Sequence, residues 1–527
     1  MKRSKDQNTV IPPNLRRRGF LKGVAGTAAL GTLASAGWPV RAAWASPDSD
    51  TVRVGLGHGS TGDSLDPGTY FDAYMMFVGW GLRNNLTEIG QSGDLLPELA
   101  ESWDMSTDAM KWTFNLRKGV EFHDGKSLTA QDVVASINHH RGDDSSSAAR
   151  PLLSGVKDIS VLNSHTVQIR LRTPNVEFAH MLSDFHLGIM PAVDGKADWR
   201  SGNGTGGYVL ESFEPGERTM LRRNPNYWKK AAAHFEAADI RVIADHTART
   251  NALMTGAVDI IDRADLQTIH LLKQNPDIQV EQVSGTQHYS IPMHANASPF
   301  SDNNVRLALK HGIDRQSIVD NILRGHGRPG NDHPIGVSNR HHSADLAQTS
   351  YDPDKAQYYL KKADMSGLDV NLSAADAAFR GAVDTAVLYQ EHAKSAGINI
   401  NVEKEPNDGY WSNVWMKKPF SMCYWGGQPT EGWMFSTSYS ANAPWNDMFW
   451  KHERFNTLLN NALAERDVEQ RGELYGELQR IVRDEGSVVI PVFADHVFAT
   501  SARVKHGELA ANWELDGLKG LERWWFA

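Results

Sequence analysis

A single cysteine, Cys423, stands in a chain of 527 residues. It excludes an intrachain disulfide, a CxxC redox pair and a cysteine-rich zinc module, so non-covalent packing must hold the fold together. The composition permits this, because 40% of the residues are hydrophobic and 22% are charged, as in globular proteins with a large core. At roughly 150 residues per domain, the length predicts about three packed units.

The first 45 residues have the three parts of an export signal. Arg16-Arg17-Arg18-Gly19-Phe20-Leu21-Lys22 is basic, residues 24–36 are apolar, and Ala43-Trp44-Ala45 offers the small residues that a signal peptidase requires. The basic run resembles the twin-arginine motif, with Arg16 where Ser or Thr is usual. We therefore predict a twin-arginine-type signal peptide over residues 1–45 and a soluble periplasmic protein that begins at Ser46.

Removal of this segment makes the chain strongly acidic. Of 54 basic and 63 acidic residues, eight basic and one acidic lie in residues 1–45, which leaves 46 and 62 and a net charge of −16. Such a chain lacks the basic surface of a nucleic-acid binder, so we expect no nucleic-acid partner.

Several local patterns predict an α/β domain near the start of the mature chain. Residues 95–103 have the pattern of a short helix that docks Trp103, and residues 111–117 alternate apolar and polar as a half-buried strand does. Thr129 has the character of an N-cap before a helix with Val133, Val134 and Ile137 on one apolar face.

The order of these blocks resembles the extracytoplasmic solute-binding family that serves peptide, nickel and opine ABC importers. The motifs that carry the resemblance are Leu95-x-Pro97-x-Leu99-Ala100-x-x-Trp103, Trp112-Thr113-Phe114-x-Leu116-Arg117-x-Gly119-Val120-x-Phe122-His123-Asp124-Gly125, Gly204-Thr205-Gly206-Gly207-Tyr208, Arg223-Asn224-Pro225-Asn226-Tyr227-Trp228, Pro299-Phe300-Ser301-Asp302-x-x-Val305-Arg306 and Tyr351-Asp352-Pro353-x-Lys355-Ala356. Many members have Pro where Gly207 stands. The resemblance covers essentially all of the mature chain.

The resemblance implies an α/β, two-lobed fold of the periplasmic-binding-protein type II, with an extra subdomain inserted in the first lobe. On this pattern, lobe I comprises residues 46–83, 195–288 and 499–527, the inserted subdomain residues 84–194, and lobe II residues 289–498. The resemblance further implies that ligand binds between the lobes and favours their closure.

The segment from Asn407 to Trp450 is crowded with aromatic residues and glycines. Aromatic walls with a few placed polar groups suit a small-solute pocket, because glycines let backbone amides approach the ligand. We predict that the ligand-binding residues are Tyr70, Arg380, Trp411, Trp425, Gly427, Gln428, Glu431, Trp433, Tyr439 and Trp445. Some rings in this segment must be core, and Trp411 and Trp415, four residues apart, are as suited to a buried helical stripe.

Two of these residues could hold the ends of a zwitterion. Tyr424-Trp425-Gly426-Gly427-Gln428 aligns with the loop that supplies an Asp to the peptide ammonium in peptide-binding relatives, but this chain has no Asp there. Glu431 could supply the same charge, and Arg380 could grip a ligand carboxylate, although a surface arginine is the competing interpretation.

Catalysis has little support in the sequence. It contains no Gly-x-Ser-x-Gly elbow, no His-Glu-x-x-His and no Walker loop. Its 21 histidines are scattered or occur as adjacent pairs. We therefore expect no catalytic residue, no metal and no cofactor, and a monomer that delivers a short peptide or peptide-like zwitterion to an inner-membrane ABC permease. A nickel chelate, opine or sugar conjugate is the alternative ligand, and an exported hydrolase, a peptide-processing enzyme or a chaperone-like binder are the alternative classes.

Overall fold

The computed structural model describes residues 50–527, so the predicted signal peptide lies outside the described residues. The described chain belongs to one compact unit. Within it, no helix combines the length and the apolar character that a membrane span would need.

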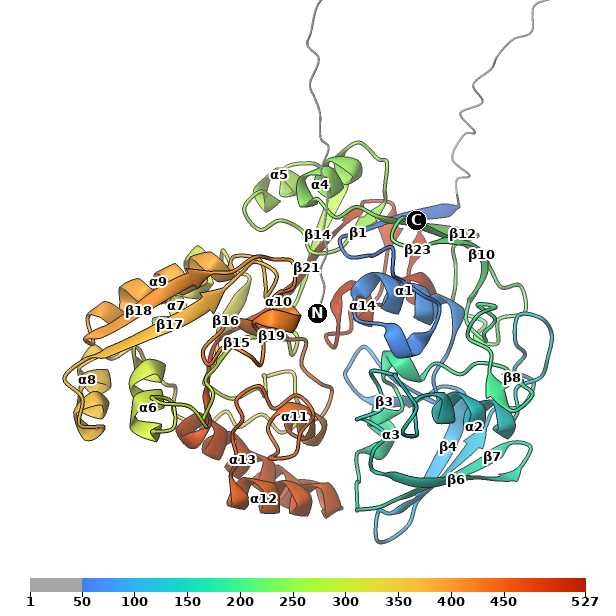
Figure 1. The fold of residues 1–527 in the computed structure, drawn as a ribbon. Helices are drawn as coiled ribbons and strands as arrows, with labels where there is room; N and C mark the ends of the chain where they lie inside the picture. The colour runs from blue at the N-terminus through green and yellow to red at the C-terminus, as the bar shows by residue number, and fades with distance from the viewer. Residues whose placement is uncertain (1–49) are drawn as a thin grey trace, which may run out of the picture. The chain divides into compact units, whose positions relative to one another are not determined.

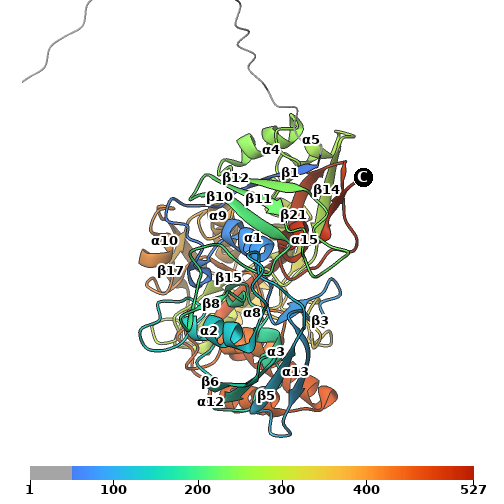
Figure 2. The ribbon, with the colours of Figure 1, turned by 90° about the vertical axis from the view of Figure 1, so that its right-hand side faces the viewer.

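A seven-stranded sheet forms the centre of what we call the first lobe (Figure 2). The strand order is β10-β11-β12-β1-β13-β21-β14, in which β1 runs parallel to β12 and β13 and the other pairs are antiparallel. The strands are β1 (Thr51–Leu56), β10 (Tyr208–Glu214), β11 (Arg218–Arg223), β12 (Ala237–Val242), β13 (Ile260–Ile261), β14 (Ile278–Val283) and β21 (His496–Ser501). Helices α1 (Ala73–Leu82), α4 (His246–Met254), α5 (Ile269–Lys273), α14 (Glu514–Gly517) and α15 (Gly520–Arg523), with β22 (Val504–Lys505) and β23 (Trp525–Phe526), complete this lobe.

The chain between α1 and β10 builds a hydrophobic core of its own. An antiparallel sheet of order β4-β5-β7-β6 packs against α2 (Ala130–His139). The strands are β4 (Ala100–Met105), β5 (Lys111–Leu116), β6 (Val156–Asn163) and β7 (Thr166–Leu171); the smaller elements are β2 (Thr87–Ile89), β3 (Leu95–Pro97), α3 (Phe178–Met181), β8 (Ala192–Val193) and β9 (Lys196–Ala197).

The helix predicted over residues 95–103 is wrong, because these residues form β3 and β4. Trp103 pairs with Phe114 of β5, so β4 gains its backbone hydrogen bonds from the next strand along the chain, with which it forms a hairpin. Pro97 has no N–H to donate, which a strand at the edge of a sheet tolerates.

The helix expected after Thr129 is confirmed as α2. The Asp132 carboxylate accepts hydrogen bonds from the Thr129 backbone N–H at 2.8 Å and from the Thr129 hydroxyl at 2.7 Å. This capping box satisfies donors that the first helical turn leaves unpaired. Val133 and Ile137 face the core, as their spacing predicts.

What we call the second lobe is built on an antiparallel sheet of order β16-β20-β15-β19 (Figure 1). Its strands are β15 (His288–Pro292), β16 (Gly327–Pro329), β19 (Cys423–Trp425) and β20 (Val488–Ala494), accompanied by the parallel pair β17 (Leu368–Ala374) and β18 (Ile398–Lys404). The helices are α6 (Asn303–His311), α7 (Arg315–Asn321), α8 (Pro353–Lys362), α9 (Ala382–Lys394), α10 (Tyr410–Asn413), α11 (Glu431–Ser438), α12 (Glu453–Ala464) and α13 (Val468–Glu485).

The chain passes between the two large sheets twice. Residues 284–287 join β14 to β15, and Asp495 alone joins β20 to β21. The Asp495 carboxylate accepts a hydrogen bond from the Ser284 hydroxyl at 2.6 Å, which ties the two crossings together. The residue limits predicted for the lobes and the inserted subdomain stay a prediction.

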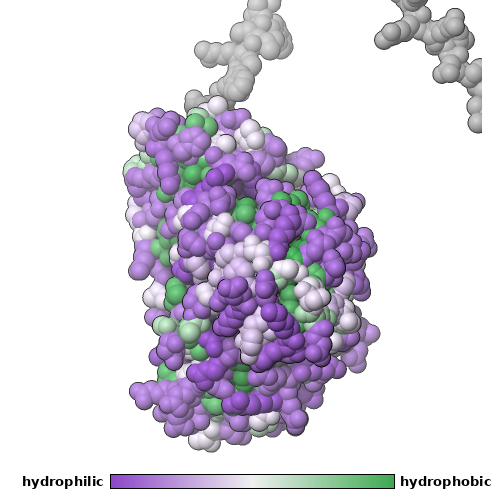
Figure 3. Space-filling view, turned by 90° about the vertical axis from the view of Figure 1, so that its left-hand side faces the viewer, coloured by the Kyte–Doolittle hydropathy of each residue, from purple (hydrophilic) through white to green (hydrophobic). Residues whose placement is uncertain are grey.

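The outer face of the second lobe, which carries α8 and α9, is largely hydrophilic, with apolar side chains interspersed among polar ones (Figure 3). Tyr358 of α8 and Val387 of α9 are among the exposed apolar residues. Single exposed apolar residues are usual on a protein surface.

Candidate functional site

Five aromatic rings of the second lobe follow one another at contact distance. The ring centroids lie 5.8 Å apart for Tyr424 and Trp411, 5.8 Å for Trp411 and Trp415, 6.2 Å for Trp415 and Trp425, and 6.4 Å for Trp425 and Trp445. None of the five is fully buried, and Trp411 on α10 is 41% exposed. We call this set the aromatic wall.

A buried acid supports the wall from behind. The Trp415 indole N–H donates to the Asp447 carboxylate at 3.1 Å. Burial raises the pKa of Asp447 to about 6, and hydrogen bonds from Trp415 and Trp425 oppose that rise. Asp447 therefore fixes the tilt of two rings. The sequence analysis did not single out Asp447; the only signal was one acid close to Trp445 in an aromatic segment.

The structure brings together Trp411, Trp425 and Trp445 of the predicted ligand residues, and it buries three others. Trp433 and Tyr439 are buried in the second lobe. Tyr70 is buried in the first lobe, where its hydroxyl donates to the Leu65 carbonyl at 3.3 Å and accepts from Arg83 Nη1 at 3.2 Å. Their aromatic character is thus used in packing.

Gly427 and Gln428 form the turn after β19, close to the first crossing between the sheets. Gly427 has φ of 82°, and a Cβ atom there would lie 2.3 Å from the Thr286 side chain. The Thr286 hydroxyl donates to the Gly426 carbonyl at 2.9 Å, and the Gln428 carbonyl accepts from Asn339 at 3.1 Å. Only glycine fits at position 427, because any side chain would collide with the crossing segment.

The structure does not bring Arg380 and Glu431 to a common partner. Arg380, 45% exposed, pairs through Nη2 with the Asp265 carboxylate at 3.0 Å and contacts His246 at 3.0 Å, so it reaches the first lobe. Glu431, 2% exposed, accepts from the His341 backbone N–H at 2.7 Å. Burial, and then the nearby Glu177, raise the pKa of Glu431 to about 7.

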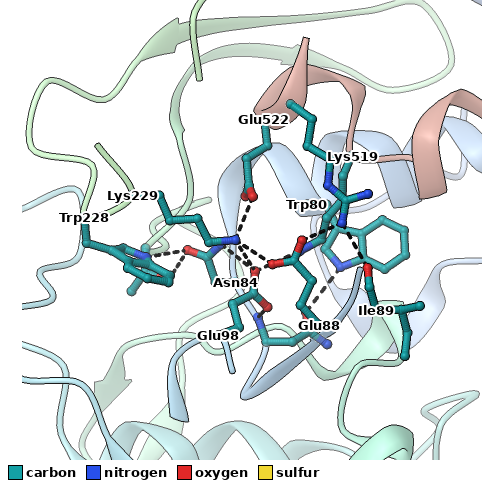
Figure 4. Close-up of polar contacts among 12 residues, drawn as sticks. Trp80, Asn84, Glu88, Ile89, Glu98, Trp228, Lys229, Lys519 and Glu522 are labelled. Atoms are coloured by element: carbon teal, nitrogen blue, oxygen red, sulfur yellow. Dashed lines mark hydrogen bonds and ion pairs between the residues drawn. The ribbon is translucent and has the colours of Figure 1, made fainter. Parts of the chain in front are cut away.

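Three carboxylates, one of the first lobe and two of the segment between α1 and β10, approach one another as metal ligands could. Oxygen atoms of Glu88, Glu98 and Glu522 lie within 4.8 Å of each other. The Lys229 ammonium lies among them, at 2.6 Å from Glu88 and 2.7 Å from Glu522 (Figure 4). Lysine thus supplies the positive charge at this place, and the cluster is an ion-pair network.

Comparisons with known proteins agree with this architecture. Residues 94–447 match the family model described as Bacterial extracellular solute-binding proteins, family 5 Middle. The probable D,D-dipeptide-binding periplasmic protein DdpA of Escherichia coli (strain K12) is 24% identical over 481 residues, which cover 85% of this chain and 90% of that protein.

Two solved structures are similar over nearly their whole length. AgaA of A. tumefaciens R10, in complex with agropinic acid, has a TM-score of 0.78 at 23% identity and covers 90% of this chain and 99% of its own. DppA of Helicobacter pylori, in complex with the peptide STSA, has a TM-score of 0.77 at 21% identity and covers 90% and 98%. These likenesses confirm the predicted α/β fold of the periplasmic binding proteins. Because the family model spans more than half of the sequence, the chain belongs to the bacterial extracellular solute-binding proteins of family 5.

Proposed function

We propose that this protein is the periplasmic solute-binding component of an ABC importer, and that it captures a short peptide or peptide-like zwitterion between its lobes and delivers it to an inner-membrane permease. Family membership supports the transport role. The names of DdpA and of the peptide-bound DppA support the substrate class. AgaA with agropinic acid supports an opine as the alternative ligand.

The aromatic wall carries this proposal. Large aromatic rings are normally buried in a core, because their exposure to water is unfavourable. A row of contacting rings that stays partly exposed is typical of a surface that a bound solute covers. Trp411, Trp425 and Trp445 are the rings that we assign to the apolar part of the ligand. The turn at Gly427 and Gln428 would offer backbone groups to its polar part.

Groups of the first lobe lie close to this side of the second lobe. A Cβ atom on Gly426 would lie 2.7 Å from the Trp513 ring, which belongs to the first lobe. Arg380 pairs with Asp265 in the first lobe and would exchange this partner for a ligand carboxylate. A ligand that contacts both lobes stabilises the closed form, because that form alone provides both sets of contacts.

Four of the predicted ligand residues would support the binding surface without contacting the ligand: Glu431, Trp433, Tyr439 and Tyr70. Their burial assigns them to the packing that holds the wall and the first-lobe helix α1 in place. We also propose that the protein binds without turnover and acts as a monomer. Recovery of an intact peptide after long incubation, and elution as a single copy, test these two statements.

The first experiment strips carried-over ligand by unfolding and refolding the mature protein. Thermal shift and calorimetry then compare di-, tri- and tetrapeptides with an opine and nickel–histidine. A ligand at 100 times its Kd should stabilise the protein by about 2.7 kcal/mol. Trp411→Ala and Trp445→Ala should each weaken binding by about 2 kcal/mol, or roughly thirtyfold. Trp525→Ala, a partly exposed ring on β23, is the matched control.

The outcomes test the peptide assignment and the transport role separately. Stabilisation by the opine or the chelate alone would overturn the peptide assignment and leave the importer role intact. Unchanged affinity in both wall variants would overturn the assigned binding surface. Unimpaired uptake of the identified ligand in cells that lack the gene would overturn the transport role.

A further inference from the structure

One carboxylate of the segment between α1 and β10 is inserted into the second lobe. Glu177 directly precedes α3. Its carboxylate accepts a hydrogen bond from the Thr430 hydroxyl and one from the Tyr475 hydroxyl, both at 2.5 Å. Beside it, the Val176 backbone N–H donates to the Leu463 carbonyl at 2.8 Å. The segment and the second lobe are therefore in direct contact at Glu177, through side chains and backbone.

The second lobe has a place shaped for this carboxylate. Gly432 lies in the first turn of α11, and a Cβ atom there would lie 2.6 Å from Glu177 Oε2. Only glycine lets the carboxylate approach the helix so closely. Glu177 is 5% exposed, and in residues 50–527 the buried Tyr475 hydroxyl forms no hydrogen bond except the one to Glu177. The contact is thus a specific fit between the two sides of the molecule.

This contact lies far from the two crossings between the large sheets. The crossings, residues 284–287 and Asp495, directly follow β14 and directly precede β21. In Figures 1 and 2, β14 and β21 lie toward the upper end of the molecule, whereas α3 and α13 lie toward the lower end. A rotation about the crossings moves groups in proportion to their distance from them, so opening of the lobes would separate Glu177 from α11 and α13.

We propose that Glu177 is a positioning residue that acts as a latch: its carboxylate docks on Thr430 and Tyr475 when the lobes close, and this contact sets how strongly the closed form is favoured. The inference rests on the proposed function, because closure matters to a protein that holds a solute between its lobes. Glu177 belongs neither to the aromatic wall nor to the turn at Gly427. It should therefore change the affinity for every ligand by a similar factor, since it acts on the equilibrium between open and closed forms.

The groups around the latch suit a contact that must also release. Docking removes water from the Glu177 carboxylate, and hydroxyl donors replace that water in part. Within the described residues no lysine or arginine contacts this carboxylate, and Arg471 on α13 donates to the Glu465 carbonyl at 2.8 Å instead. Two hydrogen bonds from neutral donors offset the loss of hydration without the strength of a buried ion pair. The closed form is thus favoured by a margin that a bound solute can change.

The test measures the distance between the two sides by pulsed electron paramagnetic resonance. Glu101→Cys on β4 and Asn460→Cys on α12 place spin labels at exposed positions, and the native Cys423 is buried and does not compete for label. The mature protein is measured as purified and after ligand has been stripped by unfolding and refolding. We expect a short-distance population with the latch formed and a long-distance population without it. Long distances alone in both preparations would overturn the proposal, because the contact would then not form.

Variants assign the short-distance population to the latch. Tyr475→Phe leaves one Glu177 oxygen without a donor, so it should lower the closed-to-open ratio by about fivefold to a hundredfold. Glu177→Gln should retain the closed form, because an amide can accept from one hydroxyl and donate to the other. Tyr389→Phe is the matched control: Tyr389 is a buried tyrosine of the second lobe whose hydroxyl donates to the Leu309 carbonyl at 2.8 Å. An unchanged ratio in Tyr475→Phe, or an equal fall in Tyr389→Phe, would overturn the latch.

A double-variant cycle shows whether the two residues act together. Glu177→Ala leaves both hydroxyls without their partner, so it should also lower the closed-to-open ratio, and this result decides the matter if Tyr475→Phe does not fold. In the Glu177→Ala protein, Tyr475→Phe should have little further effect. The same effect of Tyr475→Phe in both proteins would mean that Tyr475 acts only within the second lobe, and it would contradict the latch.

The distance measurement separates this inference from the proposed function. If no peptide, opine or nickel–histidine binds but Tyr475→Phe opens the stripped protein, the proposed ligand classes fail and the latch stands. If peptides bind and Tyr475→Phe leaves the closed-to-open ratio unchanged, the proposed function stands and the latch fails.

Discussion

Two groups of buried carboxylates in this protein differ in the groups that surround them: the first has lysine and arginine partners, and the second has only neutral hydrogen-bond donors in the described part of the chain. We call the first the balanced cluster: it consists of Glu88, Glu98 and Glu522 with Lys229 and Lys519 (Figure 4), and with Arg523, which pairs with Glu88. We call the second the acid pair, Glu177 and Glu431. Its carboxylates are contacted by no lysine or arginine among residues 50–527.

In the balanced cluster, cations lie at ion-pair distance from every carboxylate. Lys519 lies 2.8 Å from Glu98, and Arg523 lies 2.6 Å from Glu88. Burial raises the pKa of Glu88, but Lys519, Lys229 and Arg523 outweigh it and bring that pKa well below its ordinary value. At the more deeply buried Glu98, burial outweighs Lys519 and Lys229, so the pKa of Glu98 is raised. The cluster joins β2 to the α15 region as a charged contact with full partners.

The acid pair relies on neutral donors. Glu177 accepts hydrogen bonds from the hydroxyls of Thr430 and Tyr475, both at 2.5 Å. Burial raises the pKa of Glu177, and these hydrogen bonds only oppose that rise. Glu177 belongs to the segment between α1 and β10, whereas its partners belong to the second lobe. The comparison teaches that the same residue type can be satisfied in two ways: the balanced cluster uses paired charges within one side of the molecule, whereas Glu177 joins the two sides through hydroxyl donors. Ion pairs also cross between the sides, as Arg380 and Asp265 show.

The largest expected effect comes from breaking the balanced cluster. Lys229→Met leaves three buried carboxylates with two cations, so it should lower the free energy of unfolding by about 3–5 kcal/mol. Urea unfolding of the two proteins measures this. Lys230→Met is the matched control, because the adjacent Lys230 is exposed. A loss below 1 kcal/mol would mean that the cluster is not held by its charges.

The acid pair should make stability fall as pH rises. The pKa of Glu431 is raised from 4.5 to about 7 in the folded state, so between these values the folded protein holds a proton that the unfolded chain has lost. The penalty is absent below pH 4.5 and reaches up to about 3 kcal/mol above pH 7. Glu431→Gln should flatten this slope in unfolding experiments from pH 5 to 8. Glu473→Gln, an exposed acid on α13, should retain it.

Removal of one neutral donor should have the smallest effect. Tyr475→Phe leaves one oxygen of Glu177 without its hydrogen bond, which should cost about 1–3 kcal/mol at pH 7 and less as the pH is lowered, because a larger protonated fraction of the carboxyl needs fewer donors. Thermal unfolding at pH 7 and pH 5 checks this, with Tyr358→Phe on the surface of α8 as control. A cost that does not vary with pH would show that Glu177 keeps one protonation state.

Much of the fold followed from residues that act locally. Thr129 and Asp132 stand three apart and cap α2 without help from elsewhere. Residues 95–103 were misjudged because β4 pairs with β5, the next strand, and this hairpin pairing overrides a helical spacing of apolar residues.

The candidate site likewise contains features that the local sequence indicated and features that depend on contacts with distant residues. The density of aromatic residues after Asn407 indicated the wall, but it could not separate Trp425, in the wall, from Trp433, in the core, because both have the same side chain and lie eight residues apart. Glu431 follows the helix start at Thr430, and its burial depends on His341, which is 90 residues distant.

The balanced cluster has a consequence for how the protein is made. Lys519 meets Glu98 across 421 residues, and Arg523 meets Glu88 across 435. Synthesis of that many residues takes on the order of tens of seconds, during which Glu88 and Glu98 have emerged without two of their three cations. The segment between α1 and β10 can collapse early around its own core, but the first lobe can reach its final stability only after residues 519–523 have left the ribosome.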